Sequence, residues 1–249
     1  MLWRMNMILI QPGELGPDRR IVLNDARAKH IRQILKAEAG KLLRIGMLNG
    51  PLGKGVVESV VGSDVVLRCD FEASASDHPQ IDLLLAMPRP KVLKRLWAQL
   101  AALGVGRIVL LRADKVERYY FDSHVLDPAF YAPLLVEGLQ QAGCTDLPEV
   151  CIEPLFRPYV EDRFPGEFEH HLKLMADPSG DRRIKDLAPL EHGRRIVLAI
   201  GPEGGWTPFE LEMLGERGFE LIGMGGRILR TDTATVGLLA LLNEYLSGE

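Results

Sequence analysis

Hydrophobic residues in the first part of the chain occur in short runs separated by turn-forming residues. The runs with β-strand character are Met7–Ile10, Ile21–Leu23, Leu42–Met47, Val56–Val61 and Val65–Cys69. Asn49-Gly50 and Gly62-Ser63 separate the last three runs, and such pairs favour β-hairpins. Ala26–Lys36 instead has the apolar spacing of a helix. The pattern predicts a small β-barrel-like domain over residues 1–72.

The pattern changes after a polar segment without periodicity, residues 73–80, which we interpret as a linker. Ile81–Ala86 is a continuous apolar run typical of a buried strand. Lys91–Leu103 has helical periodicity and ends before Gly104, and Arg107–Leu111 is again a strand. Strand, helix and strand at this spacing predict a βαβ unit and a parallel sheet in a second domain, residues 81–249.

The same alternation continues to the end of the chain and predicts an α/β fold. The further predicted strands are Leu172–Ala176, Ile196–Ile200 and Glu220–Gly223. The further predicted helices are Pro128–Gln141, Pro208–Arg217 and Thr233–Leu246. The start of the second of these is well specified, because Thr207 is a suitable N-cap, Pro208 is at the first helical position and Glu210 completes a capping box.

Composition places the chain among ordinary globular proteins. Of its 249 residues, 47% are hydrophobic and 26% are charged. No apolar run approaches the roughly 20 residues needed to span a bilayer, and the first residues lack the layout of a secretory signal. The three cysteines, Cys69, Cys144 and Cys151, have no metal-ligand spacing, so we expect reduced thiols and no metal. These features predict a cytoplasmic protein without a membrane partner.

The net charge of −4 is unevenly distributed along the chain. Residues 1–72 hold 11 Lys/Arg against 8 Asp/Glu, and residues 87–118 hold 8 against 2. Residues 119–249 hold 11 against 22. A polyanion is therefore expected to bind the first half, with a merely solvated basic surface as the alternative.

Two glycine-rich loops carry the most chemical information. Ile196–Ile200 runs into Gly201-Pro202-Glu203-Gly204-Gly205, and Gly223–Arg230 joins another predicted strand to a helix. Glycines let backbone N–H groups approach a ligand closely, and ligands bind at the carboxyl ends of parallel strands. Two such loops at one sheet edge form a cleft; the alternative is that each is a plain tight turn.

The composition of the loops narrows the ligand class. Neither loop has the Gly-Lys-Ser/Thr of a Walker A loop or the Gly-x-Gly-x-x-Gly of a dinucleotide turn. A sulfonium cofactor requires an apolar wall for adenine, backbone groups for the ring edge and space beside the methyl. Ile228 and Leu229 are candidates for that wall. Arg230 is then expected to face the cleft. The alternative is that its side chain is a cation that caps the core.

The two loops together resemble the paired signature of the RsmE family of the SPOUT superfamily. The resemblance rests on Gly201–Gly205 and on Met224–Ala234, and it extends over nearly the whole chain. His30–Lys36 resembles the family's His-x-x-x-Val-Leu-Arg element, and Leu103-Gly104-Val105 matches its Glu-Leu-Gly-Val turn. Gln140–Gly143, followed by Leu147-Pro148, resembles its Glu-Gln-x-Gly-Arg-x-x-x-Pro element.

The resemblance implies both an activity and an architecture. The family methylates N3 of a uridine in 16S ribosomal RNA, with S-adenosyl-L-methionine as the methyl donor. Its members have an N-terminal PUA-like barrel and a C-terminal SPOUT domain, a Rossmann-like sheet with a trefoil knot. The expected partner is 16S rRNA or the small ribosomal subunit. The expected assembly is an antiparallel homodimer with active sites that draw on both subunits.

Loops, resemblance and charge together nominate three groups of site residues. For catalysis, Arg230 is the candidate that stabilises a uridine anion, while Glu203 and Asp232 are weaker candidates for a base. The alternatives are that Glu203 braces the loop and that Asp232 caps the helix. The cofactor candidates are Ile200, Gly201, Gly204, Gly205, Met224, Gly225, Ile228, Leu229 and Thr231. The RNA candidates are Arg32, Lys36, Arg89, Lys91, Lys94 and Arg95. Tyr119 and Tyr120 could stack on a base, but adjacent tyrosines are more often structural.

The sequence also departs from the family pattern. Asp232 replaces the family Glu, Gly226 replaces a Pro, and Gln140 and Cys144 stand where the family has Glu and Arg. Two other functions remain as alternatives. One is a SPOUT enzyme that methylates a ribose 2′-oxygen or a transfer RNA, and the other is a non-catalytic RNA-binding protein.

Overall fold

The computed structural model describes residues 7–75, 80–191 and 193–248. Within it the chain forms two compact units. One comprises Met1–His78 and Val136–Leu147, and the other comprises Pro79–Leu135 and Pro148–Glu249. The return of Val136–Leu147 to the first unit is a feature that the chain's local pattern does not reveal.

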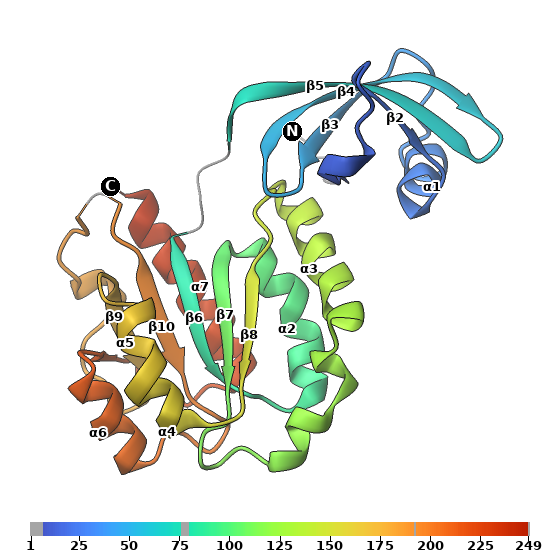
Figure 1. The fold of residues 1–249 in the computed structure, drawn as a ribbon. Coiled ribbons are helices and arrows are strands. Elements are labelled where there is room, and N and C mark those ends of the chain that lie inside the picture. The colour runs from blue at the N-terminus through green and yellow to red at the C-terminus, as the bar shows by residue number, and fades with distance from the viewer. Residues whose placement is uncertain (1–6, 76–79, 192, 249) are drawn as a thin grey trace. The chain divides into compact units, whose positions relative to one another are not determined.

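The first unit contains a five-stranded curled sheet with the order β1-β3-β4-β5-β2 (Figure 1). Its strands are β1 (Ile8–Ile10), β2 (Arg20–Leu23), β3 (Leu42–Met47), β4 (Pro51–Val61) and β5 (Asp64–Ala75). β1 pairs with β3 in parallel and the other pairs are antiparallel. The predicted hairpins are confirmed: Asn49 and Gly62 both take the positive φ that such tight turns require.

One short helix, α1 (Ala26–Gln33), accompanies this sheet, and Asp25 caps its first turn by accepting a hydrogen bond from the Arg27 N–H. Buried side chains of the helix, Ala28 and Ile31, join the apolar core of the sheet. The predicted helix is three residues too long, because Lys36 has a φ of 45° and the chain turns away after Ile34. A one-turn 3-10 helix, Pro12–Glu14, lies between β1 and β2.

Val136–Leu147 is tied to the first unit by hydrogen bonds. The Met7 N–H donates to the Gln140 carbonyl at 3.2 Å, and the Leu147 N–H donates to Asn49 Oδ1 at 2.8 Å. Buried Thr145 donates its hydroxyl to the Gly50 carbonyl at 2.7 Å. The predicted second domain, residues 81–249, is therefore interrupted, because Val136–Leu147 belongs to the first unit.

The second unit is built on a six-stranded, fully parallel sheet with the order β11-β9-β10-β6-β7-β8. The strands are β6 (Ile81–Ala86), β7 (Val105–Leu111), β8 (Glu149–Glu153), β9 (Leu172–Ala176), β10 (Ile196–Ile200) and β11 (Glu220–Ile222). All residues of the central strands β6 and β10 are buried, as their continuous apolar runs predict. The predicted α/β fold with a parallel sheet is confirmed.

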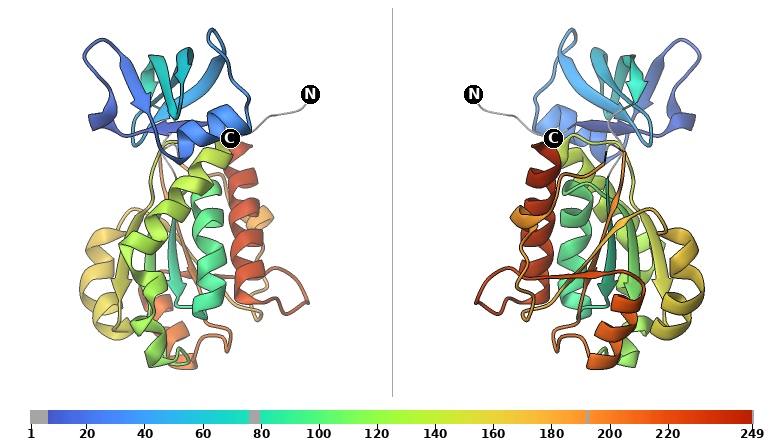
Figure 2. Two further views of the ribbon diagram at one scale, coloured as in Figure 1. Left: turned by 90° about the vertical axis from the view of Figure 1, so that its right-hand side faces the viewer. Right: turned by 90° about the vertical axis from the view of Figure 1, so that its left-hand side faces the viewer.

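Helices cover both faces of this sheet (Figure 2). α2 (Pro90–Ala102) and α7 (Thr231–Ser247) pack together on one face, and α4 (Phe156–Pro158), α5 (Phe164–Glu167) and α6 (Pro208–Glu216) lie on the other. α3 (Pro128–Ala142) stacks Tyr131 on the Trp97 ring of α2. Short 3-10 turns, Arg118–Asp122, His124–Leu126 and Ile184–Asp186, and a π-helical turn, Tyr159–Arg163, connect these elements.

In these connections one sequence prediction needs correction, and two sets of elements were missed. Residues 73–75 of the predicted linker belong to β5, because pairing with β4 continues to Ala75; residues 76–79 lie outside the described part of the chain. β8 was missed, since Glu149 and Glu153 at its ends obscure the apolar pattern. The short helices between Phe156 and Glu167 were also missed, because none is long enough to show periodicity.

A candidate methyl-transfer site

The carboxyl ends of β9, β10 and β11 surround a cavity of about 300 Å³. Its walls are formed by Ala176, Asp177, Pro178, Ile200, Gly201, Pro202, Glu203, Gly204, Gly205, Trp206, Ile222, Gly223, Met224, Gly225, Arg227, Ile228, Leu229, Thr231, Ala234 and Leu238. All nine residues that the sequence nominates for the cofactor are in this set. A volume of this size is at the lower end of small-molecule sites.

The second glycine loop presents unused hydrogen-bond donors to the cavity. Within the described part of the chain, no backbone N–H from Met224 to Leu229 donates a hydrogen bond. Gly225 has a φ of 115°, a conformation that side chains rarely permit. Trp206 Nε1 on the opposite loop is also buried without a partner among the described residues. Such groups suit a ligand with acceptor atoms along its edge.

The remaining wall is apolar. Ile200, Ile222 and Leu238 are buried at the base of the cavity, and Ile228 and Leu229 extend over it from the second loop. The Ile228 side chain is 87% exposed, an unusual state for a large aliphatic residue. An apolar wall beside free backbone donors matches the flat face and the polar edge of a nucleobase.

A second cavity of about 300 Å³ adjoins the first, because Glu203 and Thr231 line both. Its lining is Arg89, Val92, Arg95, Glu203, Arg230, Thr231 and Asp232. The structure thus brings the three nominated catalytic side chains together with two of the nominated RNA-binding arginines.

Hydrogen bonds distinguish the charged groups of this second cavity. Arg95 donates to Asp232 at 2.9 Å, and the Arg89 backbone N–H donates to Glu203 Oε1 at 3.2 Å. Arg230 occupies the N-cap position of α7 and makes no ion pair with any residue that the structure describes. The Arg89 guanidinium likewise makes no ion pair among the described residues, so Arg230 and Arg89 are the two guanidinium groups of this cavity that are available to an incoming anion.

The other nominated RNA-binding residues do not join this cluster. Lys91 and Lys94 line neither cavity, and Lys94 instead lies 5.6 Å from the centre of the Phe130 ring. Arg32 and Lys36 belong to the first unit. Periodicity predicted the helix that carries Lys91 and Lys94 but not which of its faces meets the cavity.

Two features of the site were missed by sequence analysis. Asp177 and Pro178 line the first cavity because they follow β9, and the same carboxyl-edge reasoning used for the glycine loops could have identified them. The second is Lys115, which packs against the first glycine loop: a Cβ on Gly204 would lie 2.9 Å from Lys115 Cδ.

Comparison with known proteins now identifies the family. Residues 76–243 match the model of the RNA methyltransferase domain. The chain is 30% identical to a ribosomal RNA small subunit methyltransferase E of Treponema pallidum, over 96% of this chain and 90% of that protein. The chain belongs to this family. A second RsmE relative, from Borreliella burgdorferi, is 26% identical over 93% of this chain and 94% of its own length.

Solved structures support the RsmE fold at lower identity. The RsmE protein of Neisseria gonorrhoeae, solved with S-adenosyl methionine bound, superposes with a TM-score of 0.77 at 21% identity, covering 97% of this chain and 98% of that one. A Legionella pneumophila methyltransferase, also solved with this cofactor, gives 0.74 at 23% identity, covering 96% and 97%.

The departure from the RsmE pattern at Cys144 has a structural counterpart. Arg44 of β3 reaches the same turn and donates to the Gly143 carbonyl at 3.1 Å. Burial raises the pKa of the Cys144 thiol, and the charge of Asp146 acts in the same direction while Arg44 opposes it. A guanidinium is thus present beside position 144, supplied by a different element of the chain.

Proposed function

We propose that this protein transfers a methyl group from S-adenosyl-L-methionine to N3 of a uridine in 16S ribosomal RNA. The observation that carries the proposal is the adjacency of the two cavities. A nucleoside-sized cavity between two glycine loops opens beside a cationic cavity that holds Arg230, Glu203 and Asp232. Membership of the RsmE family supplies the reaction class.

The residues of the first cavity fit this cofactor. Unpaired N–H groups between Met224 and Leu229 bind the adenine edge, and the side chains of Ile228, Leu229 and Leu238 pack on its faces. When bound, S-adenosylmethionine supplies an electrophilic methyl group. The two glycine loops would hold the cofactor in the first cavity and exclude water, and alignment of the methyl with the acceptor is the protein's main contribution to an in-line displacement.

The residues of the second cavity act on the uridine. N3 of uridine carries a proton, so the base must become an anion before or during transfer. Arg230 stabilises that anion, because its guanidinium has no competing carboxylate in the described part of the chain. Glu203 is the better candidate to accept the proton, since Asp232 already accepts from Arg95 and from the Thr233 N–H.

The first unit binds the RNA in this proposal. It is a PUA-like barrel that contributes Arg32 and Lys36 to phosphate contacts. In the second unit, Arg89 and Arg95 make phosphate contacts at the second cavity, and Lys91 and Lys94 of the same helix make phosphate contacts outside it. The second unit is a SPOUT domain in which the chain after β11 forms a trefoil knot. The strand order and the return of residues 223–230 to the loop after β10 support this topology.

The proposed enzyme works in the cytoplasm as a homodimer. The 87% exposure of Ile228 at the mouth of the cofactor cavity supports a covering subunit there. In the part of the chain that the structure describes, no helix is long and apolar enough to cross a membrane. Sedimentation equilibrium tests the dimer directly, and a monomer at working concentrations contradicts it.

The decisive experiment is nucleoside analysis. Small ribosomal subunits from a strain that lacks this protein are incubated with the purified enzyme and isotopically labelled S-adenosylmethionine, and the digested RNA is analysed by mass spectrometry. We expect labelled 3-methyluridine in 16S rRNA. A labelled 2′-O-methyl nucleoside, or label only in transfer RNA, identifies another SPOUT activity. RNA binding without any labelled nucleoside indicates a non-catalytic protein.

A further inference from the structure

The segment between β7 and α3 is attached to the first glycine loop. Lys115 Nζ donates to the Gly204 carbonyl at 2.8 Å, and its side chain fills the space that a Cβ on Gly204 would need. The Asp114 N–H donates at 2.7 Å to Glu210, a carboxylate that is buried in the first turn of α6. The segment and the glycine loop are therefore held as one body.

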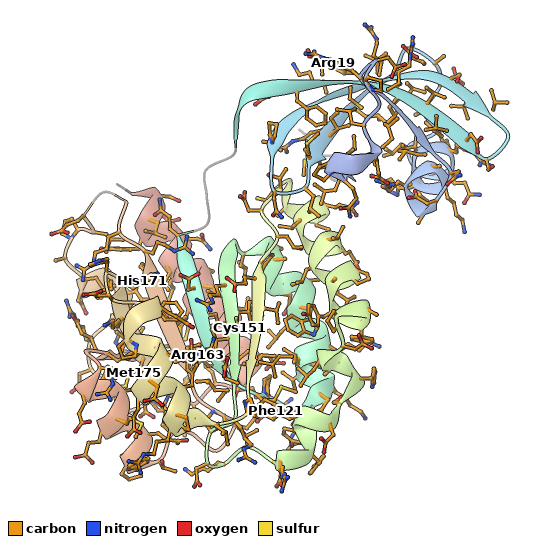
Figure 3. All side chains as sticks on the ribbon, viewed as in Figure 1. Arg19, Phe121, Cys151, Arg163, His171 and Met175 are labelled. Atoms are coloured by element: carbon orange, nitrogen blue, oxygen red, sulfur yellow. The ribbon has the colours of Figure 1, made fainter. Side chains whose placement is uncertain are left out.

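Beyond this attachment the segment forms a 3-10 turn, Arg118–Asp122, that carries two adjacent tyrosines. Phe121, in the same turn, lies at the carboxyl edge of the sheet, at the opposite end from His171 (Figure 3). The Tyr119 and Tyr120 rings meet edge to face, with centroids 4.9 Å apart. This contact restricts the rotation of the exposed Tyr119 ring.

The attachment through Lys115 connects the pair to the second cavity, because Gly204, which accepts the lysine's hydrogen bond, directly follows Glu203, and Glu203 lines that cavity. Partial burial, a hydrogen bond with Tyr119 and the charge of Glu203 raise the pKa of Tyr120, while the charge of Arg89 lowers it. Both of these charged residues line the second cavity. Tyr119 itself lines neither cavity, and its side chain is 63% exposed.

We propose that Tyr119 is a stacking surface for an unpaired nucleobase next to the methylated uridine. The inference rests on the proposed function. An exposed aromatic ring, on a segment that is hydrogen-bonded to the glycine loop of the site, is suited to binding single-stranded RNA, because every base has a π-face. We favour a neighbouring base over the target uridine as the stacking partner, because the target must enter the second cavity and Tyr119 does not line that cavity.

The test compares Tyr119→Ala, Tyr119→Phe and Tyr119→Trp by steady-state methylation of unmodified small ribosomal subunits. Loss of one stacked base weakens RNA binding, so we expect Tyr119→Ala to raise the KM for subunits about 10- to 100-fold. Because the target base is held elsewhere, kcat and the Kd for S-adenosylmethionine stay within about twofold. Tyr119→Phe keeps the ring, so its KM should stay close to that of the wild type. In Tyr119→Trp, binding of small subunits should quench the fluorescence of the added tryptophan.

The matched control is Phe209→Ala, which removes an aromatic side chain that is 53% exposed at the start of α6. This control should leave the KM unchanged. A KM for Tyr119→Ala within twofold of wild type, or a Tyr119→Phe enzyme as impaired as Tyr119→Ala, overturns the stacking role. Absence of methylation by the wild-type enzyme instead overturns the proposed function, so the two failures are distinguishable.

Discussion

Arg230 is the residue on which the proposed chemistry depends most. It stands at the N-cap of α7, where its carbonyl accepts the first helical hydrogen bond from the Ala234 N–H, and it lines the second cavity. Its neighbours there, Arg95 and Asp232, form an ion pair with an N–O distance of 2.9 Å, so their charges neutralise each other. The positive charge available to a uridine anion therefore comes from Arg230 and Arg89, neither of which makes an ion pair with a described residue.

Replacing Arg230 with Ala should reduce the single-turnover methylation rate by about 100-fold or more, as expected for the loss of one preorganised charge. The Kd for S-adenosylmethionine should change much less, because backbone groups provide most of that site. Arg230→Lys should recover only part of the rate, since an ammonium lacks the planar fork. Rapid-quench measurements on small subunits check this. Near-normal turnover by a folded Arg230→Ala enzyme would exclude the role.

Asp82 illustrates a residue whose role is structural. It is buried at the amino end of β6 and accepts hydrogen bonds from Arg195 at 2.5 and 3.0 Å, with His171 Nε2 also at 3.0 Å. Burial raises the pKa of Asp82, but the hydrogen bonds and charges of His171 and Arg195 outweigh it, so the pKa is lowered from 3.8. This cluster is at the sheet edge opposite the cofactor cavity.

A carboxyl group whose pKa is lowered by folding stabilises the protein above its unfolded pKa, and this contribution is lost as the pH falls through the folded value. Asp82→Asn should therefore lower the free energy of unfolding at neutral pH by about 3 kcal/mol. The difference from wild type should shrink below about pH 4, the region of the unfolded pKa. Denaturant titrations across pH measure this. The exposed Glu169 provides the control, and Glu169→Gln should show no such pH-dependent difference.

At the scale of elements, the start of α6 organises the cofactor loop. Thr207 caps the helix, and Glu210 accepts hydrogen bonds from the Thr207 N–H and hydroxyl through one oxygen and from the Asp114 N–H through the other. Glu210 is only 2% exposed although it is ionisable. The predicted capping box is confirmed, and the contact to Asp114 adds a connection between two loops.

Glu210→Ala should lower the free energy of unfolding by about 2–3 kcal/mol, because it leaves three donors of Asp114 and Thr207 without their acceptor. It should also weaken S-adenosylmethionine binding, since Gly201–Gly205 precedes this turn directly. Calorimetry of cofactor binding and thermal unfolding check both effects. The exposed Glu212 of the same helix is the matched control, and Glu212→Ala should change stability by less than about 0.5 kcal/mol. Equal effects of the two variants would argue against the connection.

At the scale of the whole molecule, charge separates into a basic first half and an acidic second half. Each phosphate contact made by a basic residue releases counterions from the RNA, so these contacts appear in the salt dependence of binding. Arg32 and Lys36 are on or just after α1, and the Lys36 side chain is exposed.

Reversing both charges, Arg32→Glu with Lys36→Glu, should weaken RNA binding and reduce the slope of log K against log salt by about 1–2. The Kd for S-adenosylmethionine should not change. Lys54→Glu, at an exposed position of β4, is the control for a general charge effect. An unaltered slope, or an equal change in the control, would indicate that the basic surface is only solvated.

Much of the architecture was determined by the sequence itself. Hydrophobic periodicity predicted β3 and β6 with their observed bounds, and the N-cap of α6 followed from Thr207, Pro208 and Glu210. These features are local, because backbone period, capping and turn preference depend on residues a few positions apart. The glycine loops indicated the cofactor site for the same reason, since strand, loop and helix are consecutive.

Other features were decided only by the tertiary structure. Lys115 meets Gly204 across 89 positions, Asp177 enters the cavity because β9 pairs with β10, and Val136–Leu147 joins the first unit. No local pattern encodes these contacts, because they depend on the order in which strands pair and on which surfaces remain to be buried. The strand order brings the ends of β6, β7, β9, β10 and β11 to one edge, and that arrangement turns separate loops into a site.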